Sequence, residues 1–189
     1  MPILGIIASS ILGDTSAYFP IATTTLTTTT STVTFSSIPQ TYKHLQIRAI
    51  AKTDRATYIQ DGINMRFNGD SGNNYSRHAI WGNGTSVNAD ADTSFAQIQI
   101  GMGAAGGGGT SMFAGMVLDI LDYNLTTKNK TTRALAGADD NGSVTGGTRL
   151  YFASGAWYNT SAITSITLTP QVGSNFVQYS SFALYGIKG

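Results

Sequence analysis

The sequence contains no cysteine, no glutamate and few charged residues of either sign. Without cysteine, the chain has no disulfide, no thiolate metal site and no cysteine nucleophile. Charged residues make up 11% of the 189 residues and the formal net charge is +1, so no basic patch for nucleic acid or for an anionic membrane is expected. The composition therefore predicts neither nucleic-acid binding nor membrane binding through charge.

The straight-chain helix formers Leu, Glu and Lys are scarce, whereas Thr, Ser, Gly and Asn are abundant. Threonine favours strands, and glycine and asparagine favour turns, so the composition predicts an all-β protein. A chain of this length is long enough for one sizeable core and too short for two. We expect a single domain over residues 14–189.

Long hydrophobic runs are also lacking. Residues 1–13, MPILGIIASSILG, are apolar. Their apolar part has no Lys or Arg before it, and it is shorter than the roughly 20 residues that span a bilayer. We expect neither a signal peptide nor membrane insertion. The segment is either the first strand of the chain's own sheet or a docking element that adds to a partner, and we favour docking. Its docking side chains would be Ile3, Leu4, Ile6, Ile7, Ile11 and Leu12.

Residues 32–52, TVTFSSIPQTYKHLQIRAIAK, have the pattern of strand, turn and strand. Apolar residues recur at every second position, which is the period of a strand with one buried face. Pro39 lacks an N–H for a ladder and separates the two strands. We expect them to pair in one sheet. Ile50 interrupts the polar face of the second strand, which indicates that something covers this strand from its other side.

Similar period-two segments recur along the chain and are separated by Gly- and Asn-rich turns. About ten short strands of this kind predict an antiparallel β-sandwich that is jelly-roll-like. The residues expected in its core share the apolar phase of the alternation: Phe35, Leu45, Ile47, Met65, Phe67, Leu118, Ile120, Ile166, Leu168, Phe182 and Leu184. We further expect residues 112–123 to form a central strand buried on both faces, and residues 101–110 to form an exposed glycine-rich loop.

Residues with catalytic potential are few and scattered. The only histidines are His44 and His78, and the ten aspartates show no spacing that singles out an acid–base pair. Asn88, Asp90 and Asp92 place three oxygen ligands two residues apart, but the run lacks the glycine and the distal glutamate of an EF-hand. We interpret it as a solvated loop. The sequence therefore predicts no catalytic residue, no cofactor and no metal site.

Five aromatic residues lie in segments rich in Asn, Ser and Gly: Tyr58, Tyr75, Trp81, Trp157 and Tyr158. Exposed aromatic side chains are well suited to the recognition of proteins and sugars, which makes these residues a candidate binding surface. They are equally suited to cap the ends of a sandwich core. Both interpretations remain open at the level of the sequence.

Four stretches carry a resemblance to a known family: MPILGIIASS, VTFSSIPQTYKHLQIRAIAK, RFNGDSGNNYSRH and the closing FALYGIKG. They resemble a family of virion structural proteins of tailed bacteriophages, best represented among phages of aquatic bacteria. The resemblance covers both ends and the first half of the chain, and residues 89–161 match only in their Gly/Thr-rich character. The family is assigned to the particle exterior, as tail-fibre, knob or capsid-decoration proteins with jelly-roll-like domains that are often trimeric.

The resemblance implies a non-enzymatic virion protein on the outside of a phage. It is either a tail fibre or knob that binds a receptor on the host surface, or a capsid decoration (cement) protein that clamps shell subunits. A small β-sandwich glycan hydrolase or lyase is a third alternative, disfavoured by the lack of clustered acids and histidines. The partners implied are other virion proteins and a host-surface glycan or protein.

The balance of apolar and charged residues also predicts self-association. Apolar residues make up 41% of the chain and the net charge is close to zero, so little keeps the chain soluble as a monomer. Symmetric association is the usual way to cover such a surface. We expect a homo-oligomer, namely a homotrimer.

Overall fold

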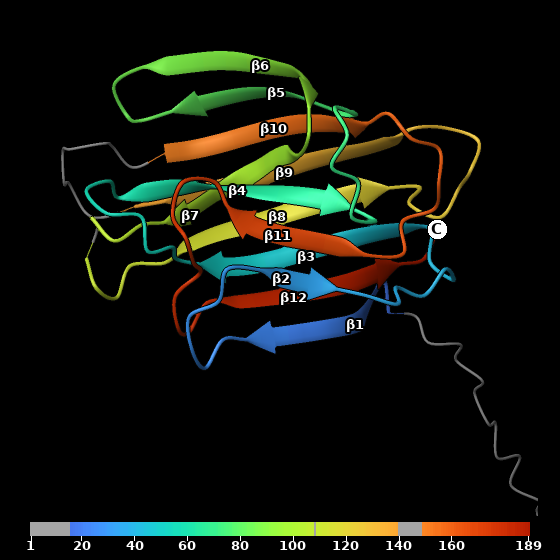
Figure 1. Cartoon of the computed structure of the whole chain (residues 1–189), viewed down its shortest axis with the longest axis horizontal. Coiled ribbons are helices and arrows are strands. Elements are labelled where there is room, and N and C mark those ends of the chain that lie inside the picture. The colour runs from blue at the N-terminus through green and yellow to red at the C-terminus, as the bar shows by residue number, and fades with distance from the viewer. Residues whose placement is uncertain (1–15, 108, 140–148) are drawn as a thin grey trace, which may run out of the picture.

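Alternating apolar and polar side chains build a protein of strands alone (Figure 1). The computed structural model describes residues 16–107, 109–139 and 149–189, which form twelve strands and no helix. The strands are β1 (Tyr18–Thr25), β2 (Val33–Phe35), β3 (His44–Ala51), β4 (Gln60–Phe67), β5 (Tyr75–Gly82), β6 (Val87–Phe95), β7 (Ile98–Ala104), β8 (Ala114–Leu121), β9 (Lys130–Ala138), β10 (Arg149–Trp157), β11 (Ile166–Pro170) and β12 (Ser181–Ile187). The prediction of an all-β protein is confirmed.

The strands form two antiparallel sheets that pack face to face. The larger sheet has the order β1-β12-β3-β8-β9-β10-β5-β6, and the smaller has the order β2-β11-β4-β7. When the inserted pairs β5–β6 and β9–β10 are set aside, two four-stranded sheets remain, β1-β12-β3-β8 and β2-β11-β4-β7. This is the strand order of a jelly roll, which is built from two Greek keys. The predicted jelly-roll-like β-sandwich is confirmed.

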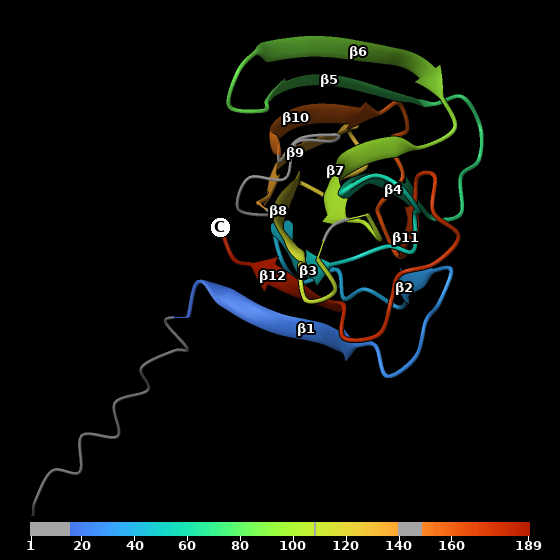
Figure 2. The same ribbon diagram turned by 90° about the vertical axis from the view of Figure 1, so that its left-hand side faces the viewer.

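The two inserted pairs of strands widen the larger sheet on one side only. β9, β10, β5 and β6 continue it beyond β8, whereas the smaller sheet ends at β7. In Figure 2, β10, β5 and β6 extend past β7 and β4. β7 packs against β9 and β10, whereas the inner face of the overhang beyond them, at β5 and β6, is only partly covered by the other sheet.

The predicted core lies between the two sheets. All eleven side chains expected there are buried, with exposed fractions of 3% or less. Aromatic pairs complete it: the rings of Phe176 and Phe182 lie 4.9 Å apart edge to face, and those of Phe67 and Trp157 lie 5.4 Å apart. Such pairs add stability beyond the apolar area that they bury.

The expected pairing of the two strands within residues 32–52, now β2 and β3, is wrong. β2 pairs with β11 in the smaller sheet, whereas β3 lies between β12 and β8 in the larger one. The connection between them is long enough to cross from one sheet to the other, which a tight hairpin is not. Pro39 lies in this crossing, where its carbonyl accepts a hydrogen bond from the Tyr123 hydroxyl.

The expected exposed loop at residues 101–110 is also wrong in its first half. Gly101 to Ala104 are buried and belong to β7. A Cβ on Gly101 would lie 2.5 Å from the Met116 sulfur and 3.1 Å from the Ala136 Cβ. Glycine is needed here because β7 packs closely against the larger sheet. The glycine content thus reflects close packing in this strand.

Two further expectations are corrected by the exposure of the strands. β8 is central in the larger sheet, but only one of its faces is buried, and Val117 is exposed on the other. Ile50 is 55% exposed on the same outer face, so no part of the described chain covers β3 there.

The run that contains Asn88, Asp90 and Asp92 was expected to be a loop, but residues 88–92 lie within β6. Residues 1–13, with their six proposed docking side chains, lie outside the described residues.

Candidate binding surfaces

The structure separates the five candidate aromatic residues. Tyr75 and Trp157 are buried, with exposed fractions of 0% and 1%, so of the two interpretations left open by the sequence these two residues follow the core one and are not a binding surface. Both lie on the inward phase of their strands, and their rings stack 6.2 Å apart in the core. Tyr158 is exposed beside Ser76. Tyr58 and Trp81 line a common polar cleft.

This cleft lies under the overhang of the larger sheet and has a volume of about 220 Å³. β10, β5 and β6 contribute one wall; β4, β7, the β3–β4 connection and the segment after β11 contribute the other. We call it the arginine cleft because three arginines line it. Its lining residues are Arg55, Tyr58, Gln60, Arg77, Trp81, Asp90, Gln99, Met102, Arg149, Tyr151 and Gln171.

Arg77 is buried and fully engaged at the back of the cleft. Its Nε and one terminal nitrogen donate to Asp92 Oδ2 at 2.8 and 2.5 Å, and that terminal nitrogen also reaches Asp90 Oδ2 at 3.2 Å. The other terminal nitrogen donates to the Tyr151 hydroxyl. Burial acts to lower the pKa of Arg77, but the bonds to Tyr151 and Asp92 outweigh it and raise the pKa. Arg77 therefore stays charged and neutralises these aspartates.

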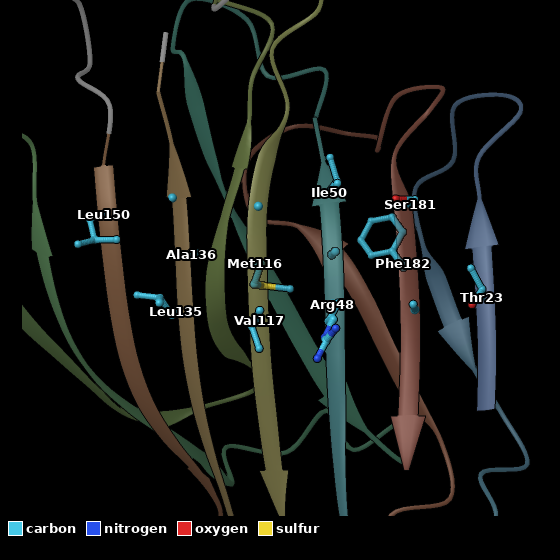
Figure 3. A pocket seen from close by; sticks show the side chains of 14 residues that line it. Thr23, Arg48, Ile50, Met116, Val117, Leu135, Ala136, Leu150, Ser181 and Phe182 are labelled. Atoms are coloured by element: carbon cyan, nitrogen blue, oxygen red, sulfur yellow. The ribbon is translucent and has the colours of Figure 1, made fainter. Parts of the chain in front are cut away.

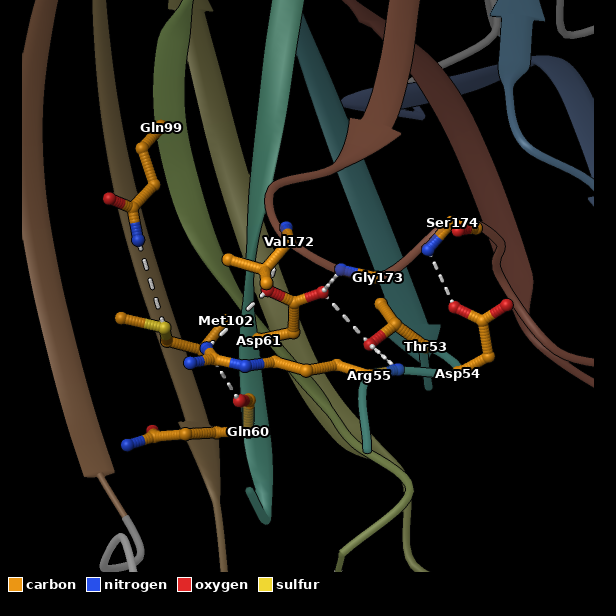
Figure 4. Close-up of polar contacts among 10 residues, drawn as sticks. All are labelled: Thr53, Asp54, Arg55, Gln60, Asp61, Gln99, Met102, Val172, Gly173 and Ser174. Atoms are coloured by element: carbon orange, nitrogen blue, oxygen red, sulfur yellow. Dashed lines mark hydrogen bonds and ion pairs between the residues drawn. The ribbon is translucent and has the colours of Figure 1, made fainter. Parts of the chain in front are cut away.

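Arg55 is positioned by a buried carboxylate on the opposite wall (Figure 4). Asp61 is inaccessible to solvent and accepts hydrogen bonds from the Thr53 hydroxyl at 3.0 Å and from the Gly173 N–H at 2.9 Å. Arg55 lies 3.7 Å from this carboxylate and donates to the Gln60 carbonyl at 3.3 Å. Its guanidinium also packs over the Tyr58 ring, 4.1 Å from the centroid.

Arg149 is the least satisfied of the three arginines. Its guanidinium lies 3.9 Å from the centroid of the Trp81 ring, and its Nε is buried without a hydrogen-bond partner. Within the described residues it forms no ion pair. Burial lowers the pKa of Arg149 and the nearby charge of Arg55 lowers it further, whereas Asp90 and Tyr151 offset this only in part. Buried polar atoms without partners are rare, so this guanidinium is a candidate ligand contact.

A second surface lies on the outer face of the larger sheet. Gly115 of β8 and Gly137 of β9 face one another in the ladder and leave a hollow of about 540 Å³, flanked by Ile50 and Leu150 (Figure 3). The hollow and the neighbouring row of side chains form what we call the apolar face. Its exposed apolar residues are Ile50, Ile80, Val117, Leu135, Leu150 and Phe152.

The histidines and aspartates do not assemble into a catalytic group. His44 Nδ1 accepts a hydrogen bond from the Asp122 N–H at 2.9 Å, and His78 is exposed on the outer face of β5. Asp90 and Asp92 share Arg77, so two of the three oxygen ligands considered for a cation are held by a guanidinium. Among the residues that the structure describes, no three His, Cys, Asp or Glu side chains form a group that could hold a metal ion.

Sequence reasoning found Tyr58 and Trp81 but missed the arginines beside them. Arg77 and Trp81 share the inward phase of β5, and Arg149 and Tyr151 share that of β10. This common phase was the available signal, but an arginine on the inward phase is ordinarily interpreted as a surface residue. The overhang creates space for these long side chains. The overhang itself results from the order of the strands in the larger sheet, which the sequence pattern does not reveal.

The arrangement defines a jelly-roll protein with a polar cleft and an apolar sheet face. No family model, no curated protein and no solved structure matches the chain. Because the described residues contain no helix, no membrane-spanning helix occurs among them.

Proposed function

We propose that the chain is a non-enzymatic structural protein on the exterior of a tailed-phage particle, of the tail-fibre or knob type, which binds the host surface. The observation that carries the proposal is the jelly-roll strand order, an architecture common in viral capsid proteins and lectins. The stretches that resemble phage virion proteins point to the same class. Fold alone does not define function, so the two surfaces carry the rest of the argument.

The arginine cleft favours binding over catalysis. Its aspartates are paired with Arg77 and Asp61 is buried in backbone hydrogen bonds, so no free carboxylate pair flanks a substrate position. Aromatic rings, amides and a guanidinium are instead the groups of a recognition site. This supports receptor binding at the host surface and disfavours the glycan hydrolase.

The apolar face favours a role in an assembly. Large exposed apolar patches on a soluble protein mark sites of association. We assign this face to the contact between copies of the chain in the expected homotrimer, because it is continuous across neighbouring strands and the chain carries little net charge. A capsid decoration protein would use such a face to clamp shell subunits, which is the alternative role.

Antibody labelling of intact particles tests the proposal. Gold-labelled antibody raised against the purified protein should decorate the tail tip or fibres of unbroken particles seen by electron microscopy. Labelling distributed over the shell would instead establish the decoration role. Absence of the protein from purified particles by mass spectrometry would contradict both roles.

A further inference from the structure

We propose that the arginine cleft binds an acidic sugar unit, with the sugar carboxylate on Arg149 and Arg55 and its hydroxyls on the cleft amides. The proposed function enters only as the source of this sugar, a polysaccharide on the host surface.

The guanidinium of Arg149 lacks a partner for one of its N–H groups. Its buried Nε has no hydrogen-bond partner, and its only contact with an aromatic side chain is the face of Trp81. The aspartates on the same wall, Asp90 and Asp92, already accept from Arg77. A guanidinium presents parallel N–H groups that match a carboxylate, so a carboxylate oxygen is the complementary group for this atom.

Two cationic side chains, those of Arg55 and Arg149, face the same cleft. Arg55 and Arg149 approach the cleft from opposite walls, and the charge of Arg55 disfavours the charged form of Arg149. Asp61 offsets Arg55 only at 3.7 Å, from a position where it is held by the Thr53 hydroxyl and the Gly173 N–H. An anion between the two guanidinium groups would relieve this repulsion.

Amide and aromatic side chains of the cleft would contact the sugar hydroxyls and the apolar side of the sugar ring. Amide side chains of Gln60, Gln99 and Gln171 line the cleft, and among the described residues the Gln99 amide donates to the Met102 sulfur alone, at 3.8 Å. Because a thioether is a weak acceptor, a ligand hydroxyl readily takes its place. Tyr58 and Trp81 supply ring surface for the apolar side of a sugar.

The size of the cleft limits the ligand to about one ring. Its volume of about 220 Å³ lies below the range of roughly 300–1,000 Å³ that is typical of drug-sized ligands. A longer glycan would place one unit inside and continue along the surface. Affinity for a single unit is therefore expected to be in the millimolar range.

The two tryptophans of the chain provide a direct test by NMR. Trp81 lines the cleft, whereas Trp157 is buried with its indole N–H on Asp70. Titration of the full chain with D-glucuronate should shift the Trp81 indole N–H signal saturably and leave the Trp157 signal in place. Trp157→Phe assigns the two signals.

Matched ligands and variants separate the parts of the proposal. Arg149→Gln should weaken glucuronate binding at least tenfold, Arg149→Lys by less, and Arg133→Gln, on the exposed outer face, should have no effect. Well-dispersed spectra establish that each variant is folded. Glucose, which lacks the carboxylate, and acetate, which lacks the hydroxyls, should each bind more weakly than glucuronate.

Several results would overturn the inference. An unmoved Trp81 signal would exclude the ligand, equal binding of glucose would exclude carboxylate recognition, and equal binding of acetate would reduce the cleft to a simple anion site. None of these three NMR results contradicts the proposed function, which depends on whether the phage particle carries the protein. Glucuronate binding by a protein that is absent from particles would refute the proposed function alone.

Discussion

Trp157 and Tyr75 show how one residue, Asp70, provides acceptors for the polar atoms of two buried aromatic side chains. The Trp157 indole N–H donates to Asp70 Oδ2 at 2.7 Å, and the Tyr75 hydroxyl donates to the Asp70 carbonyl at 3.1 Å. Buried Trp and Tyr need such partners for their polar atoms. Asp70 lies 87 positions before Trp157 in the chain, so the sequence gives no local sign of the pairing.

This contact makes stability depend on the charge of Asp70. The bond from Trp157 is the largest influence on the Asp70 carboxyl and, with Asn74 and the Gly72 N–H, lowers its pKa despite burial. A lowered folded-state pKa contributes stability above the unfolded value of about 3.9 and loses it as the pH falls through the folded value. Asp70→Asn should therefore destabilise the protein at pH 7 and progressively less below about pH 4.

Denaturant unfolding of the wild type and Asp70→Asn between pH 7 and pH 3 measures this difference. Trp157→Phe, which removes the donor but keeps the carboxylate, should reduce the same acid-dependent part of the stability. A constant difference between wild type and Asp70→Asn over the whole range would contradict the assignment.

Two glycines, Gly101 of β7 in the smaller sheet and Gly115 of β8 in the larger sheet, offer a second residue-scale prediction. Gly101→Val should destabilise the protein by about 1–3 kcal/mol, because its side chain would overlap Met116 and Ala136 in a packed core. Gly115→Val is the matched control, since no heavy atom lies within 4 Å of its Cβ position on the apolar face. Thermal and denaturant unfolding should separate the two variants, and equal losses would argue against the close packing of β7.

At the scale of elements, the period-two pattern predicted where strands and core residues lie but not how the strands pair. Leu45, Ile47 and the other core positions were predictable because alternation depends only on the local chain. Whether β2 pairs with β3 or with β11 depends on long-range contacts that alternation does not encode. The arginine cleft was unpredictable for the same reason, since it exists only because β5 and β6 extend the larger sheet past β7.

The segment before β1 gives a prediction about an element. We expect the apolar residues 2–13 to dock on a partner and not to form the first strand of the sandwich. Deletion of residues 2–13 should leave a folded protein that melts cooperatively but is no longer incorporated into particles. Circular dichroism and particle assembly assays measure the two properties. Loss of cooperative melting would mean that the segment belongs to the sandwich.

At the scale of the whole molecule, the widened sheet gives the protein two different sides. Its outer side exposes a continuous apolar row in which Val117, Leu135 and Phe152 are neighbours across three strands. Its inner side holds the core and, under the overhang, the arginine cleft. A subunit built in this way can associate through one side of the sheet and keep its cleft open to a ligand.

Self-association through the apolar face is testable with two substitutions on β9. Leu135→Lys places a charge in the centre of the face and should shift the oligomer to monomer, because burial of an unpaired lysine is costly. Thr131→Lys adds the same charge at an exposed position of the same strand and should leave the oligomer unchanged. Light scattering measures both masses, and a stable wild-type monomer of 19.9 kDa at micromolar concentration would contradict the predicted oligomer.

The most direct measurement of the whole account is a cryo-electron microscopy reconstruction of the intact particle that carries this chain. The account predicts density for the twelve-stranded sandwich on the particle exterior, with the apolar face against a neighbouring copy and the arginine cleft open to solvent. A sandwich located inside the shell, or one that exposes Leu135 and buries Arg149 against a neighbour, would contradict it.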